Sequence, residues 1–370
     1  MLKALKSLNK SVLILLVVVI FLPIFLIVLL AVLQSCSNRS SYDKYERDMI
    51  TAAGKYLKSK DLISNLNENS ELVTLDILVS NGYIKQPDKV LKDTNCEGYV
   101  TARKNGNVKQ LDLKGNIQYN VYLKCDKYKT NTLISNVMED LTTSESGLYE
   151  DGSYYVYKGD NVNNYIKFYG QLYRIMSVDS NEIVKLVKNG SQTMSKAWDN
   201  KYNIESKSSA GKTIYKDSLI LKSLLDNYLN NKIINEEARK HIVSHDSCIG
   251  KRDKNDLSIS YDLDCSEILS NQVISLINIS DFARASLDPD CNLISDRSCR
   301  NYNYLSYSVN NSWTLNSVID NSYEVYYLSS GLPRITKASE RNPYNIVIYI
   351  DGNEFISSGT GSQNNPYIIE

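Results

Sequence analysis

A long apolar run near the N-terminus constrains this chain more than any other feature. Val12–Leu33 contains no charged residue. At about 1.5 Å per residue, a helix of this length spans roughly 33 Å, enough to cross a hydrocarbon core of about 30 Å. Pro23 lies near its middle, where transmembrane helices tolerate proline. The run therefore predicts one membrane-spanning helix within residues 11–35.

The charges on either side of this run predict its orientation. Basic side chains precede it, at Lys3, Lys6 and Lys10, and acidic side chains follow it, at Asp43, Glu46 and Asp48. Because positive flanks stay inside the cell, we expect a cytoplasmic tail at residues 1–10 and extracellular domains from about residue 36. The run is longer than the apolar core of a secretory signal, about 7–15 residues, which favours an uncleaved signal anchor in the cell membrane.

Cys36 leaves a second interpretation open. Leu33-Gln34-Ser35-Cys36 resembles the bacterial lipobox, with leucine three residues before the cysteine and a small residue directly before it. In that case residues 1–35 are removed and Cys36 carries a lipid anchor. Both interpretations place the rest of the chain outside the cytoplasm and attach it to the membrane.

The other six cysteines all lie in the exported part of the chain. Local spacing favours three short-range disulfides, Cys96–Cys125, Cys248–Cys265 and Cys291–Cys299, although six cysteines allow 15 pairings. An oxidising exterior agrees with this interpretation. The alternative is six reduced, buried cysteines, but the residues beside them are polar. Zinc ligation is disfavoured because the sequence contains no C-x-x-C pair.

Composition excludes one class of partner. Lys plus Arg and Asp plus Glu balance at 42 each, so no net charge favours binding to nucleic acid. The chain has 28 Tyr against 5 Phe. Tyrosine packs like other aromatic residues but keeps a polar tip, which suits solvent-washed sheets and interfaces.

Residues 36–130 predict a small α+β domain. Apolar side chains recur at helical spacing over 42–60, and a short helix or strand follows in "LVTLDILVSNGYI". The segments "GYVTARKNGNVKQ" and "NIQYNVYLKC" alternate as strands do, and Asn105-Gly106 is a hairpin-turn signal. The apolar run, this amphipathic helix and the cysteine-closed sheet resemble type IV pilin-like and pseudopilin-like proteins. The resemblance implies a component of a secretion or pilus-like assembly.

Residues 131–148 are interpreted as a linker, and 149–370 as a second, mostly antiparallel β domain with a few helices. Alternating segments from Tyr165 to Lys188 predict hairpins packed on one face. Leucine spacing predicts a helix over 217–230, with Asp217 as its cap, and a second helix over 235–243. Further strands are expected in "QVISLI", "SWTLN", "EVYYL" and "YNIVIYI", and a short helix from Ser280-Asp281.

Four segments occur in order in this second half: "GSYYVYKGDNVNNYIKFYGQLYRIMSVD", "ISLINISDFARASLD", "SWTLN" and "GTGSQNNPYII". On these segments it resembles an uncharacterised extracellular domain of surface proteins from Gram-positive Firmicutes. The resemblance implies a fold distantly similar to C-type lectins and carries no activity with it. The fold class predicted for the whole chain is α+β.

No group of residues predicts catalysis, so the sequence leaves the enzyme question open and favours a non-enzyme. His241 and His245 stand four apart, as zinc ligands on a helix do, but the H-E-x-x-H motif is absent. Asp-rich turns, with Asp262, Asp264, Asp288 and Asp290, could hold calcium, although such turns are common without it. Trp198 and Trp313 are either sugar-stacking platforms or buried anchors. We expect a surface protein that binds cell wall, glycan or another protein, or has a structural role; the alternatives are a pseudopilin-like component and an extracellular hydrolase.

Overall fold

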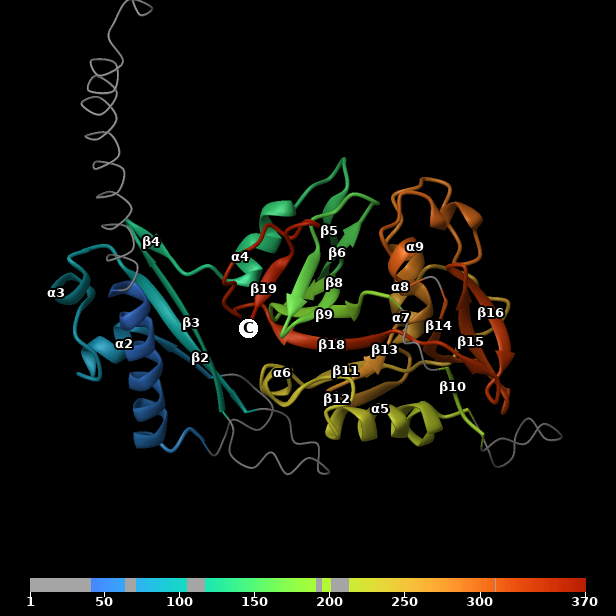
Figure 1. The fold of residues 1–370 in the computed structure, drawn as a ribbon, viewed down its shortest axis with the longest axis horizontal. Helices are drawn as coiled ribbons and strands as arrows, with labels where there is room; N and C mark the ends of the chain where they lie inside the picture. Colours follow the sequence, from blue (N-terminus) through green and yellow to red (C-terminus); the bar gives the residue numbers. More distant parts are fainter. Residues whose placement is uncertain (1–40, 64–70, 105–116, 191–194, 201–212, 310) are drawn as a thin grey trace, which may run out of the picture. The chain divides into compact units, whose positions relative to one another are not determined.

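The computed structural model describes residues 41–63, 71–104, 117–190, 195–200, 213–309 and 311–370 (Figure 1). They form two compact units. One includes Leu72–Val100 and Val121–Thr130, and the other includes Asn131–Glu370. The apolar run Val12–Leu33 and Cys36 lie outside the described residues. Within the described ranges, no helix is long and apolar enough to cross a bilayer.

The N-terminal unit packs one long helix on a small antiparallel sheet. Residues 41–59 are helical, close to the predicted 42–60. The sheet has the order β1-β2-β3-β4. The remaining elements are β1 (Glu71–Thr74), α2 (Leu75–Ser80), α3 (Pro87–Leu91), β2 (Glu97–Lys104), β3 (Ile117–Cys125) and β4 (Tyr128–Lys129). The segment predicted as helix or strand is thus a strand followed by a helix, because Thr74 caps the backbone N–H of Ile77. The predicted Asn105-Gly106 turn lies outside the described residues.

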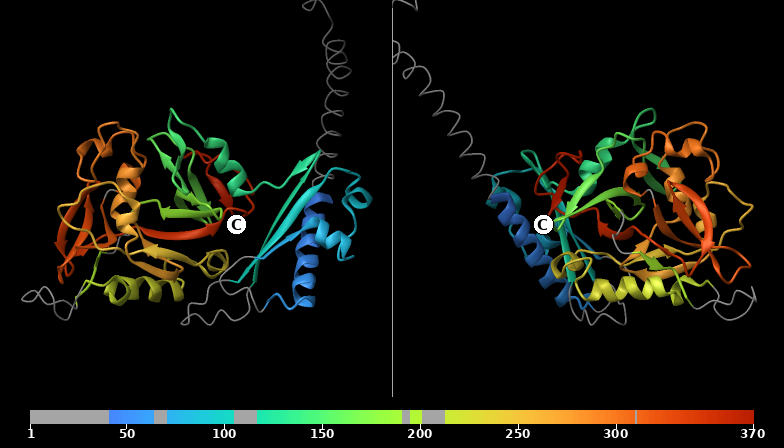
Figure 2. Two further views of the ribbon diagram at one scale, coloured as in Figure 1. Left: turned by 180° about the vertical axis from the view of Figure 1, so that it is seen from behind. Right: turned by 45° about the vertical axis from the view of Figure 1, so that its right-hand side comes forward.

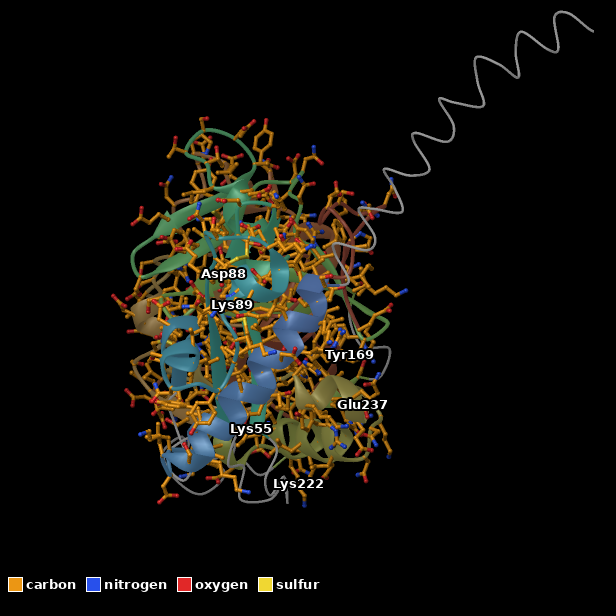
Figure 3. All side chains as sticks on the ribbon, turned by 90° about the vertical axis from the view of Figure 1, so that its left-hand side faces the viewer. Lys55, Asp88, Lys89, Tyr169, Lys222 and Glu237 are labelled. Carbon is orange, nitrogen blue, oxygen red and sulfur yellow. A yellow bond between two sulfur atoms is a disulfide. The ribbon has the colours of Figure 1, made fainter. Side chains whose placement is uncertain are left out.

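Apolar side chains at helical spacing form part of the core of this unit. Tyr45, Met49, Ala53 and Leu57 form a buried stripe on the helix at 41–59, and Lys55 is exposed on it (Figure 3). Polar contacts fix the same helix to β4. Its Glu46 carboxylate accepts hydrogen bonds from the hydroxyls of Tyr128 and Thr130, and the rings of Tyr42 and Tyr128 stack with centroids 4.4 Å apart.

The C-terminal unit is built on an eight-stranded sheet. Its main path runs β13-β18-β9-β8-β6-β5, and β7 pairs with β8 and, in parallel, with β19. Strands distant in sequence are therefore neighbours: β9 (Ile183–Lys188) lies beside β18 (Ile346–Asp351), near the middle of the unit (Figure 1). The other members are β5 (Gly147–Asp151), β6 (Tyr154–Lys158), β7 (Tyr165–Phe168), β8 (Gln171–Asp179), β13 (Ser275–Leu276) and β19 (Tyr367–Ile369).

Smaller sheets and short helices surround this sheet (Figure 2). A three-stranded sheet contains β14 (Asn311–Ser317), β15 (Glu324–Ser329) and β16 (Leu332–Lys337), and two-stranded pairs join β10 (Lys196–Ala197) to β17 (Arg341–Asn342) and β11 (His245–Cys248) to β12 (Ile268–Gln272). The α-helices are α4 (Leu133–Val137), α5 (Leu219–Leu229), α6 (Glu236–Lys240), α7 (Tyr261–Asp264), α8 (Ile279–Arg284) and α9 (Leu305–Ser308). The α+β class with mostly antiparallel sheets agrees with the prediction.

Residues 131–148 are not a linker. They form α4, a 3-10 turn and the start of β5, and their apolar side chains Leu133, Val137 and Leu148 are fully buried in the core of the C-terminal unit. The spacing of Leu133 and Val137 is that of a short helical stripe, which the surrounding Thr, Ser and Gly residues obscured in the sequence.

The helix predicted over 217–230 also begins later than expected. Asp217 is not its cap, because the hydroxyl of Ser218 accepts the hydrogen bond from the backbone N–H of Leu221. The observed helix, α5, spans Leu219–Leu229 and buries Ile220, Leu221, Leu224 and Tyr228.

We expect Leu224→Ala to lower the free energy of unfolding of the C-terminal unit by about 2–5 kcal/mol, because it leaves a cavity at a fully buried position. Urea unfolding followed by tryptophan fluorescence measures this unit alone, since both tryptophans, Trp198 and Trp313, lie in it. Leu219→Ala on the same helix is the control, because Leu219 is 36% exposed and its loss should cost much less. Equal effects of the two changes would contradict the burial pattern.

Candidate functional site

The C-terminal unit carries an open polar cleft with a volume of about 490 Å³. The turn between β5 and β6, the segment leading into α7 and the end of α8 form its walls. We call it the tyrosine cleft. The side chains that line it include Asp151, Tyr154, Lys158, Tyr261, Asp262 and Arg284. This volume lies in the range of small-molecule sites, about 300–1,000 Å³.

A smaller inner pocket adjoins the tyrosine cleft. Tyr154, Tyr261 and Arg284 line both spaces, and the inner pocket is otherwise lined by Val156, Met176, Ser177, Lys185, Asp281 and Tyr304. Its volume of about 20 Å³ leaves room for about one water molecule. The two spaces together form a polar cleft with a narrow end directed into the protein.

A buried ion pair lies at this narrow end. The Lys185 ammonium on β9 donates to both carboxylate oxygens of Asp281 on α8, at 3.0 and 2.8 Å, and both side chains are 6% exposed. Asp281 also accepts from the backbone N–H of Asn278 at 2.8 Å, closing the N-terminus of α8. Charged side chains this deeply buried require such a partner, since desolvating a lone charge is very costly.

A second ion pair crosses the mouth of the cleft. Arg284, at the C-terminal end of α8, donates from Nη2 and Nε to Asp151 Oδ2, at 3.1 and 3.3 Å. Lys158 reaches the same carboxylate at 3.8 Å. The Arg284 guanidinium lies 4.9 Å from the centroid of the Tyr261 ring, and the rings of Tyr261 and Tyr154 meet at 5.1 Å. These contacts fix the aromatic walls relative to the charged groups.

Arg252 holds the segment that carries Tyr261. Its guanidinium is 1% exposed and donates to the carboxylate of Asp264 at 3.1 Å and to the backbone carbonyls of Ser258 at 2.7 Å and Ser260 at 3.3 Å. Residues 258–260 contain no helix or long strand, so these bonds supply the fixed geometry that regular secondary structure would otherwise provide. Tyr261 follows directly as the first residue of α7.

The tyrosine hydroxyls of this site act as neutral hydrogen-bonding groups. Burial, reinforced by the nearby carboxylate of Asp281, raises the pKa of Tyr261. Burial likewise raises the pKa of Tyr304, despite the opposing effect of Arg174. Both phenols therefore keep their protons at physiological pH, and they can donate hydrogen bonds to a ligand.

The six cysteines of the described residues form the three disulfides that local spacing favoured: Cys96–Cys125, Cys248–Cys265 and Cys291–Cys299. The last of these touches the tyrosine cleft through Cys291. Three disulfides are typical of a protein that folds in an oxidising, extracytoplasmic compartment.

Neither tryptophan offers a ring face for sugar stacking. Trp198 and Trp313 are both 0% exposed, and their indole N–H groups donate to the backbone carbonyls of Thr314 at 2.9 Å and Lys196 at 2.7 Å. These bonds join the β10 segment to β14. Both tryptophans are therefore buried anchors, one of the two interpretations that the sequence left open.

The two histidines do not form a metal site. The helix α6 ends at Lys240, so His241 and His245 do not share a helical face. His241 Nδ1 lies 3.0 Å from the buried carboxylate of Glu354, and His245 Nε2 lies 3.1 Å from Asp179. The ring of His241 also contacts Tyr169, labelled with Glu237 of α6 in Figure 3.

The pKa values of the two acids shift in opposite directions, although the histidine contact lowers the pKa of each acid. Burial acts to raise the pKa of Asp179, but hydrogen bonds from His245 and from the backbone N–H of Ile183 outweigh it and hold that pKa below its usual range. Burial raises the pKa of Glu354, and the hydrogen bond with His241 only partly opposes it. Both pairs lie outside the tyrosine cleft and join segments distant in sequence.

In the Asp-rich turns, the carboxylates of Asp264 and Asp288 already bind groups of the protein itself. Asp264 pairs with Arg252, and Asp288 accepts from the backbone N–H of Asp290 at 2.9 Å and from Asn301 at 2.8 Å. Of the four acids, only Asp262 belongs to the tyrosine cleft. No calcium-type cluster of these acids occurs within the described ranges.

One group of metal-ligand types does come together in the described part of the chain. Asp93, Cys96 and Cys125 place a carboxylate oxygen and two sulfur atoms within 4.8 Å of one another. The two sulfurs are joined in a disulfide, whereas metal ligation by cysteine uses the thiolate. As folded here, these residues do not fit a metal ion.

Comparison with known proteins adds no assignment: no family model, curated protein or solved structure matches the chain. The pilin-like and surface-protein resemblances therefore stay predictions, and the site rests on its geometry alone.

The residues of the tyrosine cleft were not predicted as a site. Tyr154, Tyr261 and Arg284 are far apart in sequence and follow no known motif. A signal was nevertheless present at Lys185, the first of the two lysines in "IVKLVK", whose first five residues are all buried. A lysine that interrupts a strand buried on both faces requires an acidic partner, and this reasoning could have directed attention to the inner pocket.

We expect Lys185→Met to lower the free energy of unfolding by about 3–5 kcal/mol, because it leaves the Asp281 carboxylate buried without a counter-charge. Urea unfolding monitored by tryptophan fluorescence measures the change. Lys158→Met is the control, since Lys158 is 25% exposed, reaches Asp151 only at 3.8 Å and should cost less than about 1 kcal/mol. A small effect at Lys185 would contradict the buried ion pair.

Proposed function

We propose that this chain is a membrane-anchored, extracytoplasmic surface protein whose C-terminal unit binds a ligand of the cell surface in the tyrosine cleft. The single observation that carries the proposal is the cleft itself. It gathers partly exposed aromatic rings and charged side chains that come from three separate segments and are fixed by buried ion pairs. Aromatic and polar groups placed together in a concave site are the usual form of a small-ligand site.

The extracytoplasmic placement is supported by the three disulfides and by the charge pattern around Val12–Leu33. The helix and disulfide-closed sheet of the N-terminal unit agree with a pilin-like stalk that presents the C-terminal unit. The pseudopilin-like alternative uses the same N-terminal unit but predicts co-purification with an assembly ATPase.

A second candidate function is extracellular hydrolysis. The observation that favours it is the presence of three carboxylates, Asp151, Asp262 and Asp281, beside tyrosines in one cleft. Against it, Asp151 and Asp281 are already engaged by cations, whereas a hydrolytic general acid must hold a proton. Release of soluble fragments from cell-wall sacculi, abolished by Asp151→Asn, would favour this function over binding.

We expect peptide mass mapping of the chain purified from membranes without reductant to find an intact N-terminus, an unmodified Cys36 and the three disulfides. This result follows because Val12–Leu33 is too long for a cleaved signal. A chain that begins at a diacylglyceryl Cys36 would replace the helical anchor with a lipid. Free thiols at all six exported positions would contradict the extracytoplasmic placement.

We expect the detergent-purified full chain to co-sediment with purified bacterial cell-wall sacculi, and Arg284→Gln to reduce this binding at least fivefold, because it releases the Asp151 carboxylate and loosens the Tyr261 wall. Arg239→Gln is the matched control. Like Arg284, Arg239 is partly buried, and its guanidinium lies 5.5 Å from the centroid of the Tyr228 ring, but it lies outside the cleft. Binding unaffected by Arg284→Gln would exclude the cleft as the binding site.

A further inference from the structure

We propose that the tyrosine cleft takes a neutral saccharide and that the inner pocket seats one of its hydroxyl groups. This inference rests on the proposed binding function and names the chemistry of the ligand. It follows from the charge balance of the cleft, from two unpartnered hydroxyls in the inner pocket, and from the sizes of the two spaces.

The charges of the cleft cancel. Three cationic side chains, Lys158, Lys185 and Arg284, line the two spaces together with three acidic ones, which are Asp151, Asp262 and Asp281. Each cation is within 4 Å of a carboxylate. An anionic polymer would therefore gain no net attraction here and would have to displace an existing ion pair. A ligand without charge avoids this cost.

The inner pocket contains hydroxyl groups that the protein leaves unbonded. Tyr304 is 1% exposed, and within the described part of the chain its hydroxyl has no hydrogen-bond partner although the residue lines the pocket. Ser177 lies opposite Lys185 in the paired strands β8 and β9, so the two side chains share the face that meets Asp281. Ser177 is partly buried, and its hydroxyl makes no hydrogen bond among the described residues.

Neither hydroxyl is among the fully buried side-chain atoms that lack a partner in the described residues, so a ligand or a water molecule can reach both of them. Hydroxyl groups both donate and accept hydrogen bonds, as the hydroxyl of a sugar does. The inner pocket holds about one water-sized group, since its volume is about 20 Å³. A single sugar hydroxyl has this size and this hydrogen-bonding capacity.

The outer part of the cleft suits the ring of a sugar. The rings of Tyr154 and Tyr261 are both partly exposed and meet at an angle of 64°, so they present two apolar surfaces to the same space. Beside them stand Asp262 and the Arg284–Asp151 pair, which can hydrogen-bond to ring substituents. A sugar ring has the same combination of apolar faces and a polar rim.

The proposal is tested with the full chain in detergent by calorimetric titration of three neutral tetrasaccharides: a β-1,4-linked N-acetylglucosamine tetramer, cellotetraose and maltotetraose. An acidic tetragalacturonate of equal length is the comparison. We expect at least one neutral probe to bind. Its Kd should change less than twofold between about 0.05 and 0.5 M NaCl, since no net charge is involved.

Tyr304→Phe should weaken binding of that probe about fivefold, because it removes one hydrogen bond and leaves the ring in place. The control is Tyr228→Phe, another buried tyrosine, which stands on α5 and belongs to neither space. Tighter, salt-sensitive binding of the acidic probe would overturn the inference of a neutral ligand. So would equal affinity of the Tyr304→Phe and wild-type chains for the neutral probe.

Failure of this inference and failure of the proposed function give different results. If sacculi bind the chain in an Arg284-dependent way but none of the neutral probes binds, the cleft is a binding site and its ligand is not a neutral saccharide. If neither sacculi nor any oligosaccharide binds, both the inference and the proposed function fail.

Discussion

The buried pair of Lys185 and Asp281 is the interaction on which the candidate site depends. It joins the central strand β9 to α8, and through Asp281 it also closes the N-terminus of that helix at Asn278. Asn278 in turn donates to the backbone carbonyl of Cys248 at 2.6 Å. One carboxylate therefore fixes a strand, a helix and the start of the disulfide-closed segment. Because α8 ends at Arg284, this pair also sets the position of the cation at the mouth of the cleft.

Arg252 connects the N-terminus of α8 to the cleft wall that carries Tyr261. It contacts the hydroxyl of Ser280, the residue before Asp281, at 3.2 Å, and Asp264 accepts from the backbone N–H of Ser280 at 3.2 Å. Two buried cations thus engage neighbouring positions at the N-terminus of α8, one from the sheet and one from the irregular segment before Tyr261. A buried ion pair adds little net stability over an apolar contact, but it accepts only one geometry. In a unit with short helices and long irregular segments, this specificity is what positions side chains from distant parts of the chain.

Local sequence patterns predicted the elements of this protein better than its site. The helix over 41–59 was found because Tyr45, Met49 and Ala53 recur at helical spacing, and the disulfides because the cysteines close short loops. The helix expected over 235–243 is shorter than predicted, since α6 ends at Lys240, so His241 and His245 share no helical face. Of the two interpretations left open for Trp198 and Trp313, burial is the right one, because the β10–β14 contact covers both rings. The tyrosine cleft escaped prediction for a related reason. Its residues come together through long-range strand pairing and buried ion pairs, and the buried Lys185 is the one local signal of this arrangement in the sequence.

The disulfides connect this site to the compartment in which the chain folds. Cys248–Cys265 closes the segment that contains Arg252 and leads to Tyr261, and Cys291–Cys299 closes the loop that follows α8. Both restrict segments of largely irregular backbone, and a disulfide stabilises such a segment mainly by limiting its unfolded conformations. Cys248–Cys265 thus closes the stretch of backbone that presents Ser258 and Ser260 to Arg252, and Cys291 itself lines the cleft. Disulfides in both positions are typical of a protein that folds in an oxidising compartment.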